Sequence, residues 1–338
     1  MNKQALEKIA QAMVADGKGL LAADESTGTI KKRFDSINTE STQTSRRDYR
    51  EMLFRTSAAM SNHISGVILY DETIRQSADD GTTLVSLIEQ SGAIPGIKVD
   101  TGAKDMAGHA GEKVTEGLDG LRERLQEYHQ LGARFAKWRG VINITDDLPS
   151  AACLTANTHA LARYAALCQE NGIVPIVEPE VIMDGSHTAA RCYDVTTATL
   201  QQLYAQLDEQ GVYLEGTILK PNMIVSGTEC PEQADIQQVA EMTLKCFHEA
   251  VPISVPGIVF LSGGQSDELA TAHLDAMNKM GAQPWKLGFS YGRALQAAPL
   301  KSWGGDAANI GAAQAAFLHR AKMNWLAARG EWSADLEV

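Results

Sequence analysis

Eight short apolar runs constrain the fold of this sequence more than any other feature. Each run is rich in Gly, Val, Ile or Leu and is too short for a typical helix. They are Lys18–Ala23, Gly66–Tyr70, Gly96–Val99, Arg134–Trp138, Ile173–Val177, Thr217–Leu219, Ile258–Leu261 and Trp285–Phe289. Such runs predict eight buried β-strands.

Longer amphipathic stretches separate these runs and predict helices. Clear examples are Leu118–Gly132, Ala160–Gly172 and Ser266–Gly281, each of which closes on a glycine that can end a helix. Eight strand-then-helix units predict a parallel sheet, and a closed barrel accounts for eight units better than an open sheet. The predicted fold is α/β, a single (β/α)8 TIM barrel.

A doubly wound open sheet that binds a nucleotide is the alternative architecture. It would be favoured by a G-x-G-x-x-G fingerprint after the first strand, and the sequence has none there.

The chain reads as one domain, because no Pro-, Ser- or Gly-rich linker divides its 338 residues. We predict a barrel over residues 1–329 with an N-terminal helix, in which Leu6, Ile9, Ala10 and Met13 recur at helical spacing. Residues 330–338 show no element pattern and predict a short, mobile C-terminal tail.

Composition narrows the possible partners and the compartment. The net charge is −12 and no dense Lys/Arg run occurs, which argues against a nucleic-acid or anionic-membrane surface. No apolar run approaches the roughly 20 residues of a membrane span, and the N-terminus lacks the apolar core of a signal peptide. Five cysteines without a C-x-x-C pair indicate a reducing cytoplasm.

Metal chemistry has little support in the sequence. The eight histidines are scattered and form no H-E-x-x-H motif or clustered ligand spacing. We therefore expect neither a metal nor another cofactor.

Charged and small polar residues gather at the ends of the predicted strands. In a parallel barrel these ends share one rim, where catalytic groups lie. In chain order the run ends carry Asp24 and Glu25, Asp71 and Glu72, Lys98 and Asp100, Lys137 and Arg139, Glu178 and Glu180, Lys220, Ser262, Gly263 and Gly264, and Ser290 with Arg293. Charge at so many strand ends exceeds what a structural role alone explains, so the pattern predicts an active site at this rim.

Lysines near other cations predict a nucleophilic amine. A lysine is protonated at neutral pH unless burial or neighbouring positive charge lowers its pKa. Lys220 follows two apolar residues and is expected to face Lys137 and Arg139. Lys98 and Lys137 remain competing nucleophiles, because spacing alone does not exclude them.

The last two strand ends predict a phosphate site. The glycines after Ser262 leave backbone amides open to an anion, and Ser290, Gly292 and Arg293 add a small turn with a guanidinium. Barrels frequently bind phosphate with the loops after strands seven and eight.

Seven ordered segments resemble the class I, Schiff-base fructose-bisphosphate aldolases. They are LLAADESTGTIKKR, GIKVD, FAKWR, NGIVPIVEPE, YLEGTILKPNM, FLSGGQS and FSYGRALQ, and the resemblance extends from about Gly17 to Ala328. It implies a metal-free aldehyde-lyase that reversibly cleaves fructose 1,6-bisphosphate to dihydroxyacetone phosphate and glyceraldehyde 3-phosphate in glycolysis and gluconeogenesis. It also implies a homo-oligomer, a tetramer in many relatives.

The resemblance also implies residue roles. Lys220 would form the Schiff base, Glu178 would shuttle protons to and from the carbinolamine, and Asp24 would take the hydroxyl proton as the carbon-carbon bond breaks. Glu180 and Lys137 would support charge around the keto carbon. Ser262, Gly263 and Arg293 would bind the ketone-side phosphate, and Lys98, Arg139, Lys32 and Arg33 are candidates for the other phosphate.

One departure from the family concerns proton return to the enamine. Animal members end in a tyrosine on a mobile tail that assists this step, whereas this sequence has no tyrosine after Tyr291. We expect slower protonation, or protonation by water or another side chain.

Two rival functions are compatible with a barrel. One is a Schiff-base enzyme acting on a different phosphosugar, such as a transaldolase-like transferase. The other is a non-catalytic binding or scaffold role, since a fold alone does not determine function. The intact set of Lys220, Glu178 and Asp24 speaks against the scaffold.

Overall fold

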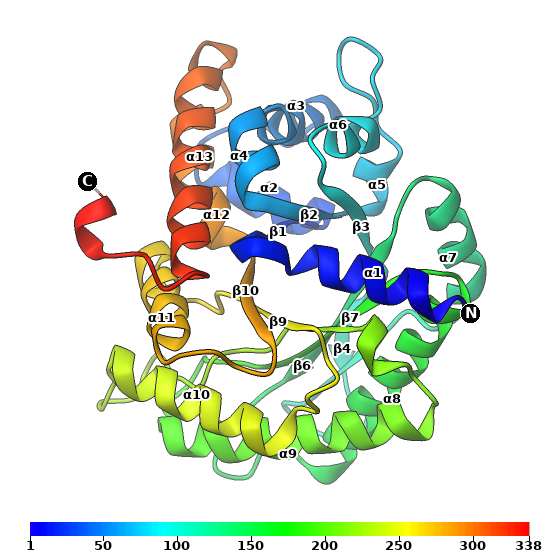
Figure 1. The fold of residues 1–338 in the computed structure, drawn as a ribbon, viewed down its shortest axis with the longest axis vertical. Coiled ribbons are helices and arrows are strands. Elements are labelled where there is room, and N and C mark those ends of the chain that lie inside the picture. Colours follow the sequence, from blue (N-terminus) through cyan, green and yellow to red (C-terminus); the bar gives the residue numbers. More distant parts are fainter. Residues whose placement is uncertain (338) are drawn as a thin grey trace.

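The computed structural model describes residues 1–337, in which eight parallel strands close into a barrel (Figure 1). Around the barrel the order is β1-β2-β3-β6-β7-β8-β9-β10, with β10 pairing back to β1. The strands are β1 Gly19–Ala23, β2 Ile64–Leu69, β3 Ile94–Lys98, β6 Phe135–Ile142, β7 Val174–Val181, β8 Ile218–Leu219, β9 Gly257–Phe260 and β10 Lys286–Tyr291. Every predicted run corresponds to a barrel strand, and the prediction of a TIM barrel is confirmed.

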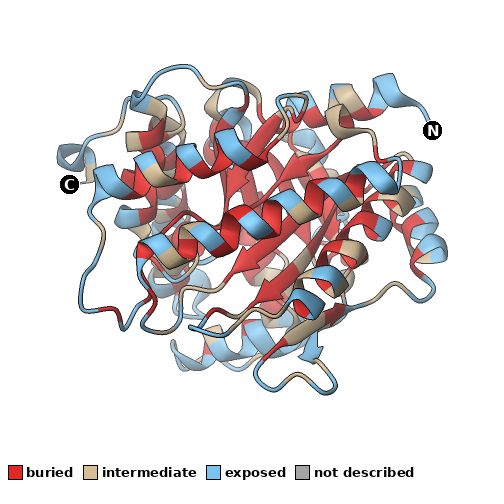
Figure 2. Cartoon of the chain, turned by 90° about the horizontal axis from the view of Figure 1, so that it is seen from below, coloured by how far each residue is buried: buried red, intermediate tan, exposed pale blue. Residues whose placement is uncertain are grey.

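Helices cover the outside of the barrel, and Figure 2 shows their inner faces buried (red) and their outer faces exposed (pale blue). The buried inner faces carry the apolar side chains of the core. They are α2 Thr27–Asp35, α3 Gln43–Phe54, α4 Ser57–His63, α5 Asp71–Ile74, α6 Leu84–Gln90, α7 Leu121–Gln130, α8 Ala151–Glu170, α9 Ala189–Glu209, α10 Ile236–Ala250, α11 Asp267–Lys279, α12 Arg293–Trp303 and α13 Ile310–Ala327. Gly132 and Gly172, two residues past the ends of α7 and α8, have positive φ angles of 108° and 72°, as the sequence predicted for helix stops.

The N-terminal end of the barrel is closed by hydrocarbon. Helix α1, Lys3–Met13, crosses this end and packs Leu6, Ala10 and Met13 against side chains of the barrel interior (Figure 1). Phe135 is completely buried there, and the absent side chains of Gly66 and Gly96 leave room for its ring. The charged side chains inside the barrel therefore lie at its other end, where the strands have their C-termini.

The sequence did not predict a hairpin that follows β3. Strands β4, Gly102–Asp105, and β5, Lys113–Glu116, pair in antiparallel fashion outside the barrel. Most of their residues are at least partly exposed, so they lack the apolar run that marks the barrel strands. The Thr115 hydroxyl donates to the carbonyl of Arg139 at 2.7 Å, which anchors the hairpin beside β6.

The C-terminal segment packs on the barrel, although no element was predicted there. Residues Ala334–Glu337 form a short 3₁₀ helix, and Glu337 pairs with Arg320 of α13 and accepts a hydrogen bond from Trp332 Nε1 at 3.0 Å. The partners come from distant parts of the chain, which is why local pattern did not show them. The mobility of residues 330–338 stays a prediction, and Val338 lies outside the described residues.

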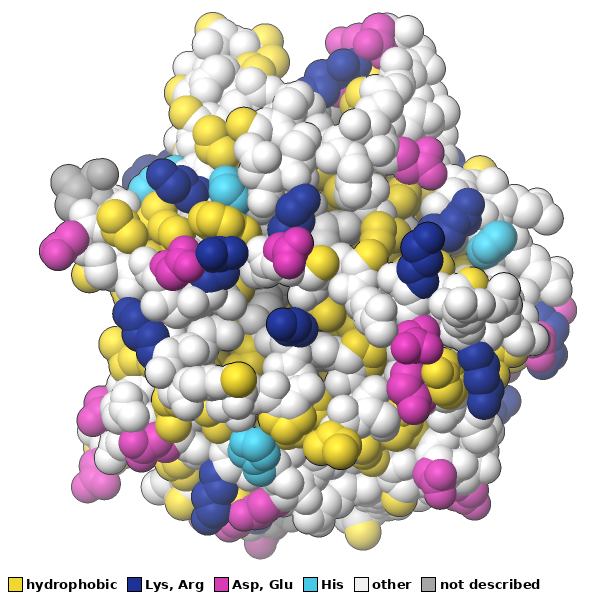
Figure 3. All heavy atoms as spheres, in the orientation of Figure 1, with side chains coloured by type: hydrophobic (Ala, Val, Ile, Leu, Met, Phe, Trp, Pro, Cys, Tyr) yellow, Lys and Arg dark blue, Asp and Glu magenta, His cyan; other side chains and the backbone are white. Residues whose placement is uncertain are grey.

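Within residues 1–337 no helix is both long and apolar enough to cross a membrane. On the face shown in Figure 3, which carries α1, basic and acidic side chains are interspersed and do not separate by sign.

Candidate active site

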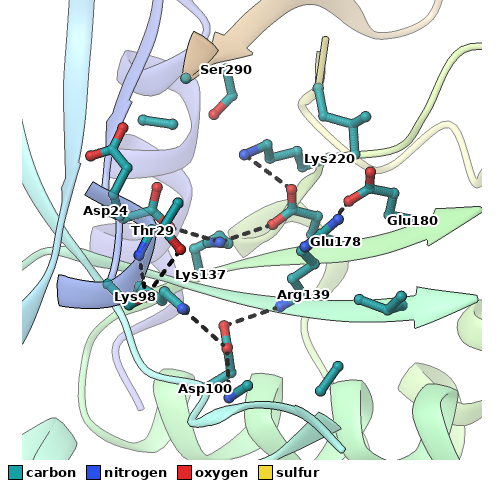
Figure 4. A pocket seen from close by; sticks show the side chains of 18 of the residues that line it. Asp24, Thr29, Lys98, Asp100, Lys137, Arg139, Glu178, Glu180, Lys220 and Ser290 are labelled. Atoms are coloured by element: carbon teal, nitrogen blue, oxygen red, sulfur yellow. Dashed lines mark hydrogen bonds and ion pairs between the residues drawn. The ribbon is translucent and has the colours of Figure 1, made fainter. Parts of the chain in front are cut away.

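A cavity of about 270 Å³ opens where the C-terminal ends of the barrel strands meet (Figure 4). Twelve of the residues predicted from the sequence line it. They are Asp24, Arg33, Lys98, Lys137, Arg139, Glu178, Glu180, Lys220, Ser262, Gly263, Ser290 and Gly292. The strand-end pattern thus identified one shared cavity.

Lys220 enters the cavity from the end of the shortest strand. Strand β8 has only two residues, but the backbone N–H of Lys220 continues the ladder by donating to Val177 of β7 at 2.8 Å. The side chain is 5% exposed, and its Nζ lies 3.1 Å from Glu178 Oε1. The nearest charged partner of the candidate nucleophile is therefore a carboxylate.

Glu178 connects two lysines. Its Oε1 faces Lys220, and its Oε2 lies 3.2 Å from Lys137 Nζ. Burial alone would raise the pKa of Glu178, but Lys137 and Lys220 outweigh burial, so the pKa lies below its ordinary value. The carboxyl is thus ionised while both lysines carry charge.

Asp24 completes a chain of four ionisable groups. It follows β1 and lies 2.8 Å from Lys137 Nζ, so Lys137 bridges Asp24 and Glu178. Burial favours neutral Asp24, but Lys137 and then Lys220 lower its pKa well below the usual range. The same pairing raises the pKa of Lys137 against the effect of burial, with Asp24 and Glu178 as the main partners. Lys137 is consequently a fixed cation and a poor nucleophile.

A second set of pairs occupies the far side of the cavity. Arg139 Nε forms an ion pair with Glu180. Arg139 lies two residues after Lys137 on β6, and Glu180 lies two residues after Glu178 on β7, so this pair lies next along the same faces of the two strands. Burial lowers the pKa of Arg139 and Glu180 raises it, with a net rise. Asp100 lies 3.6 Å from Lys98 Nζ and accepts from the backbone N–H of Gly102 at 3.2 Å. It thereby links β3 to the hairpin.

Basic and acidic side chains line the cavity in equal numbers among the described residues. Five cations line it, Arg33, Lys98, Lys137, Arg139 and Lys220, and so do five carboxylates, Asp24, Glu25, Asp100, Glu178 and Glu180. The sequence showed both sets at the strand ends but could not show which cations pair with which carboxylates. The pairing has a physical reason, because buried charges without partners are costly.

Several lining residues were not assigned to the site beforehand. Asp100 and Glu25 appeared at run ends without a role, and Asp100 shares a strand face with Lys98, which could have indicated it. Ser26, Thr29, Gly102 and Ala103 also line the cavity. The first two belong to the segment that enters α2, and the last two to the unpredicted hairpin.

The loop after β9 forms a tight turn. Gly263 and Gly264 have φ angles of 41° and 78°, and a β-carbon on Gly264 would come within 2.7 Å of Met183 Sδ. The N–H of Gln265 closes the turn on the Ser262 carbonyl at 2.9 Å. Glycine is therefore required at both central positions.

Three predicted phosphate ligands do not line this cavity. Gly264 lies on the outer side of the turn, and Lys32 is exposed on α2. Arg293 begins α12, donates through Nη2 to the Gln265 carbonyl at 2.8 Å and lines a neighbouring hollow with Arg33. Arg33 itself lines both spaces and pairs with Glu25 at 2.5 Å.

One group of three carboxylates among the described residues is compact enough to bind a metal ion. It comprises Asp48, Glu51 and Asp79, none of which lines the Lys220 cavity. Arg47 pairs with Asp48 and Asp79, and Arg55 pairs with Glu51 at 2.7 Å. Arginines therefore already balance this acidic group.

The family model described as "Fructose-bisphosphate aldolase class-I" matches residues 5–338. The chain belongs to the class-I fructose-bisphosphate aldolase family. The resemblance found in the sequence motifs is confirmed, and with it an activity of the lyase class EC 4.1.2.13.

Individual relatives support the same membership. A protein of Xanthomonas axonopodis pv. citri (strain 306), described as a probable fructose-bisphosphate aldolase class 1, is 59% identical over 98% of this chain and 99% of its own length. The muscle-type aldolase of Lethenteron camtschaticum is 50% identical over 98% and 91%. A solved structure of Plasmodium falciparum fructose-bisphosphate aldolase, in complex with TRAP and a small molecule inhibitor, matches with a TM-score of 0.96 and 46% identity, over 98% of this chain and 96% of that one.

Proposed function

We propose that this class-I aldolase family member cleaves fructose 1,6-bisphosphate through a Schiff base on Lys220 and catalyses the reverse condensation. The observation that carries the proposal is the buried chain Lys220, Glu178, Lys137 and Asp24, whose successive charged atoms are 3.1, 3.2 and 2.8 Å apart. In this proposal the chain supplies one amine, two proton carriers and a fixed cation to a single reacting centre.

The first step joins Lys220 to the ketone. The ammonium loses a proton, Nζ attacks the keto carbon, and the resulting carbinolamine must lose its hydroxyl as water. Glu178 is within 3.1 Å of Nζ and can move protons in both stages.

The electrostatics of Glu178 suit this change of role. Its pKa is low while Lys137 and Lys220 are both charged. When Lys220 becomes the uncharged nitrogen of the carbinolamine, one of the two cations that lower the pKa of Glu178 is lost. Burial, which raises this pKa, is then opposed by fewer positive charges. The carboxyl then gains basicity at the stage at which a proton must be held for the leaving hydroxyl.

Bond cleavage follows once the iminium has formed. A base takes the proton of the hydroxyl two carbons from the imine, that carbon becomes the aldehyde, and the electron pair of the broken bond enters the iminium to give an enamine. Asp24 is ionised and lies on the opposite side of Lys137 from Glu178, so we assign it this base role. Lys137 and Glu180 balance charge around the centre.

The two phosphates would bind at the two sides of the cavity. We assign the ketone-side phosphate to Ser262, Gly263, Gly264, Ser290, Gly292 and Arg293. The other phosphate falls to Lys98, Arg139, Lys32 and Arg33. Because Arg33 pairs with Glu25, phosphate binding there requires Arg33 to exchange or share this partner.

The enamine must regain a proton before dihydroxyacetone phosphate leaves. The described tail packs against α11 and α13, and residues 292–338 contain no tyrosine. We propose that water or a cavity side chain returns the proton to the enamine carbon.

A cleavage assay in the presence of EDTA tests the function. The proposal expects both triose phosphates from fructose 1,6-bisphosphate at an unchanged rate, because the amine and the carboxylates supply the chemistry. Loss of activity in EDTA that is restored by a divalent cation would favour a metal-dependent mechanism.

We also propose a cytoplasmic homo-oligomer, a tetramer by family resemblance, that acts in glycolysis and gluconeogenesis. All five cysteines are free and buried, which suits a reducing compartment. A relative named "Fructose-bisphosphate aldolase 4, cytosolic" from Arabidopsis thaliana is 49% identical to this chain. Light scattering behind size-exclusion chromatography would determine the number of subunits.

A further inference from the structure

Gln265 holds two parts of the ketone-side phosphate region through its backbone. Its N–H closes the Ser262–Gln265 turn at 2.9 Å, and its carbonyl accepts from Arg293 Nη2 at 2.8 Å. The position of this one residue therefore controls both the turn and the arginine assigned to the phosphate.

The Gln265 side chain is buried and fixed at both of its polar ends. Its Oε1 lies 2.6 Å from Nδ1 of His273 on α11. Its Nε2 points at Met223 Sδ, 3.6 Å away. Met223 comes three residues after Lys220, so one amide connects α11, the turn and the loop of the candidate nucleophile.

His273 is a buried base that the proposed chemistry does not use. It is 2% exposed, and burial lowers its pKa from 6.5 to about 4, so the ring is neutral near pH 7. With Gln265 Nε2 directed at Met223, Oε1 faces the ring, and Nδ1–H is the donor. The described residues offer no hydrogen-bond partner to His273 Nε2.

A histidine in this position is costly, because one of its ring nitrogens is buried without a partner. An apolar side chain would fill the space without that cost. What the histidine adds is the short hydrogen bond to Gln265, and through it the orientation of the turn.

We infer that His273 and Gln265 are positioning residues for the ketone-side phosphate, holding the turn and Arg293 in register with the Lys220 loop. The inference rests on the proposed function. Backbone amides bind an anion best when their geometry is set in advance, so loosening the pair should weaken phosphate binding more than it slows chemistry.

The test compares three variants. His273→Leu removes the hydrogen bond, His273→Asn keeps a side-chain amide that can donate, and Ser65→Ala is the control. Ser65 donates from a buried hydroxyl to the carbonyl of Met13 at 2.6 Å, at the closed end of the barrel. Each variant is assayed for kcat, for KM with fructose 1,6-bisphosphate and for inhibition by inorganic phosphate. Borohydride trapping then compares dihydroxyacetone phosphate with phosphate-free dihydroxyacetone.

For His273→Leu we expect KM and the inhibition constant of phosphate to rise about tenfold, the effect of losing one useful hydrogen bond. The change in kcat should be much smaller, and trapping of dihydroxyacetone on Lys220 should match wild type. His273→Asn should recover most of the phosphate affinity, and Ser65→Ala should change neither constant.

Unchanged phosphate inhibition in folded His273→Leu would overturn the inference, as would an equal loss of trapping with both ketones. If His273→Leu does not fold, Gln265→Met removes the same hydrogen bond from the other side. It must then raise KM and the inhibition constant of phosphate while changing kcat much less. Failure of the wild type to trap either ketone would instead refute the proposed function.

Discussion

The two ends of the barrel are built from the same strands and have opposite chemistry. Inward-facing positions recur every second residue, and along β7 they pass from Ile176 to Glu178 and Glu180. Along β6 they pass from Phe135 to Lys137, and at β8 from Ile218 to Lys220. A rise of about 6.6 Å, two residues of strand, separates packed hydrocarbon from the ionised cluster.

This difference explains how the cluster can be buried without losing its charge. The apolar layer excludes water from below, so each charge depends on a partner in the same layer. The strands hold those partners at fixed positions, as when Glu178 of β7 lies between Lys137 of β6 and Lys220 at the end of β8. The apolar layer thus contributes mainly to stability and the charged layer mainly to catalysis. Mutations in one layer should therefore affect one property more than the other.

The largest expected effect is loss of catalysis at the charged end. Lys220→Met removes the nucleophile, and we expect cleavage to fall at least about 10⁴-fold. Glu178 keeps Lys137 as a partner, so the melting temperature should change little. A steady-state assay and calorimetry measure the two effects, and a variant that kept substantial activity would exclude Lys220 as the nucleophile.

Glu178→Gln should have a large but smaller effect. The amide keeps the shape of the side chain and loses its proton-carrying ability, so we expect kcat to fall about 10²–10⁴-fold. Single-turnover kinetics should show slow formation of the trapped adduct. Normal adduct formation with slow cleavage would move the role of Glu178 to a later step.

At the closed end the main effect should be on stability. Phe135→Ala leaves a cavity among fully buried side chains and should lower the free energy of unfolding by about 3–5 kcal/mol. The folded protein should keep its KM and most of its kcat at low temperature. Urea unfolding with parallel assays tests this, and a stable but inactive variant would show that the two layers are not separable.

His273 predicts a pH dependence of stability. Its pKa is about 4 in the folded protein against 6.5 when unfolded, so the unfolded state binds the extra proton between these values. Stability is fully present above pH 6.5 and falls as the pH drops toward 4. The wild type should lose about 2 kcal/mol more than His273→Asn between pH 7 and pH 4.5. Equal losses would mean that the ring titrates normally.

Deleting residues 330–338 should have the smallest effect. Loss of the Glu337–Arg320 pair should reduce stability by about 1–2 kcal/mol, while cleavage stays within about twofold of wild type. Proton exchange on the enamine, followed by hydrogen isotope incorporation, should also be unchanged. A severe fall in exchange would show that the tail takes part in returning the proton.

The sequence predicted the layers better than the contacts within them. Short apolar runs located all eight strands, and the residues that follow them located the cavity, because parallel strands bring their carboxyl ends together. Pairing between strands depends on register and side-chain reach. The bonds of Asp24 to Lys137 and of Arg293 to Gln265 were therefore not predictable from local pattern. The hairpin Gly102–Glu116 was missed because its strands are largely exposed.

Trapping the adduct tests the central claim most directly. The wild-type protein is incubated with fructose 1,6-bisphosphate, reduced with borohydride, digested and sequenced by mass spectrometry. The account predicts one stoichiometric adduct on Lys220, with Lys98 and Lys137 unmodified. No adduct, or an adduct confined to Lys98 or Lys137, would contradict it.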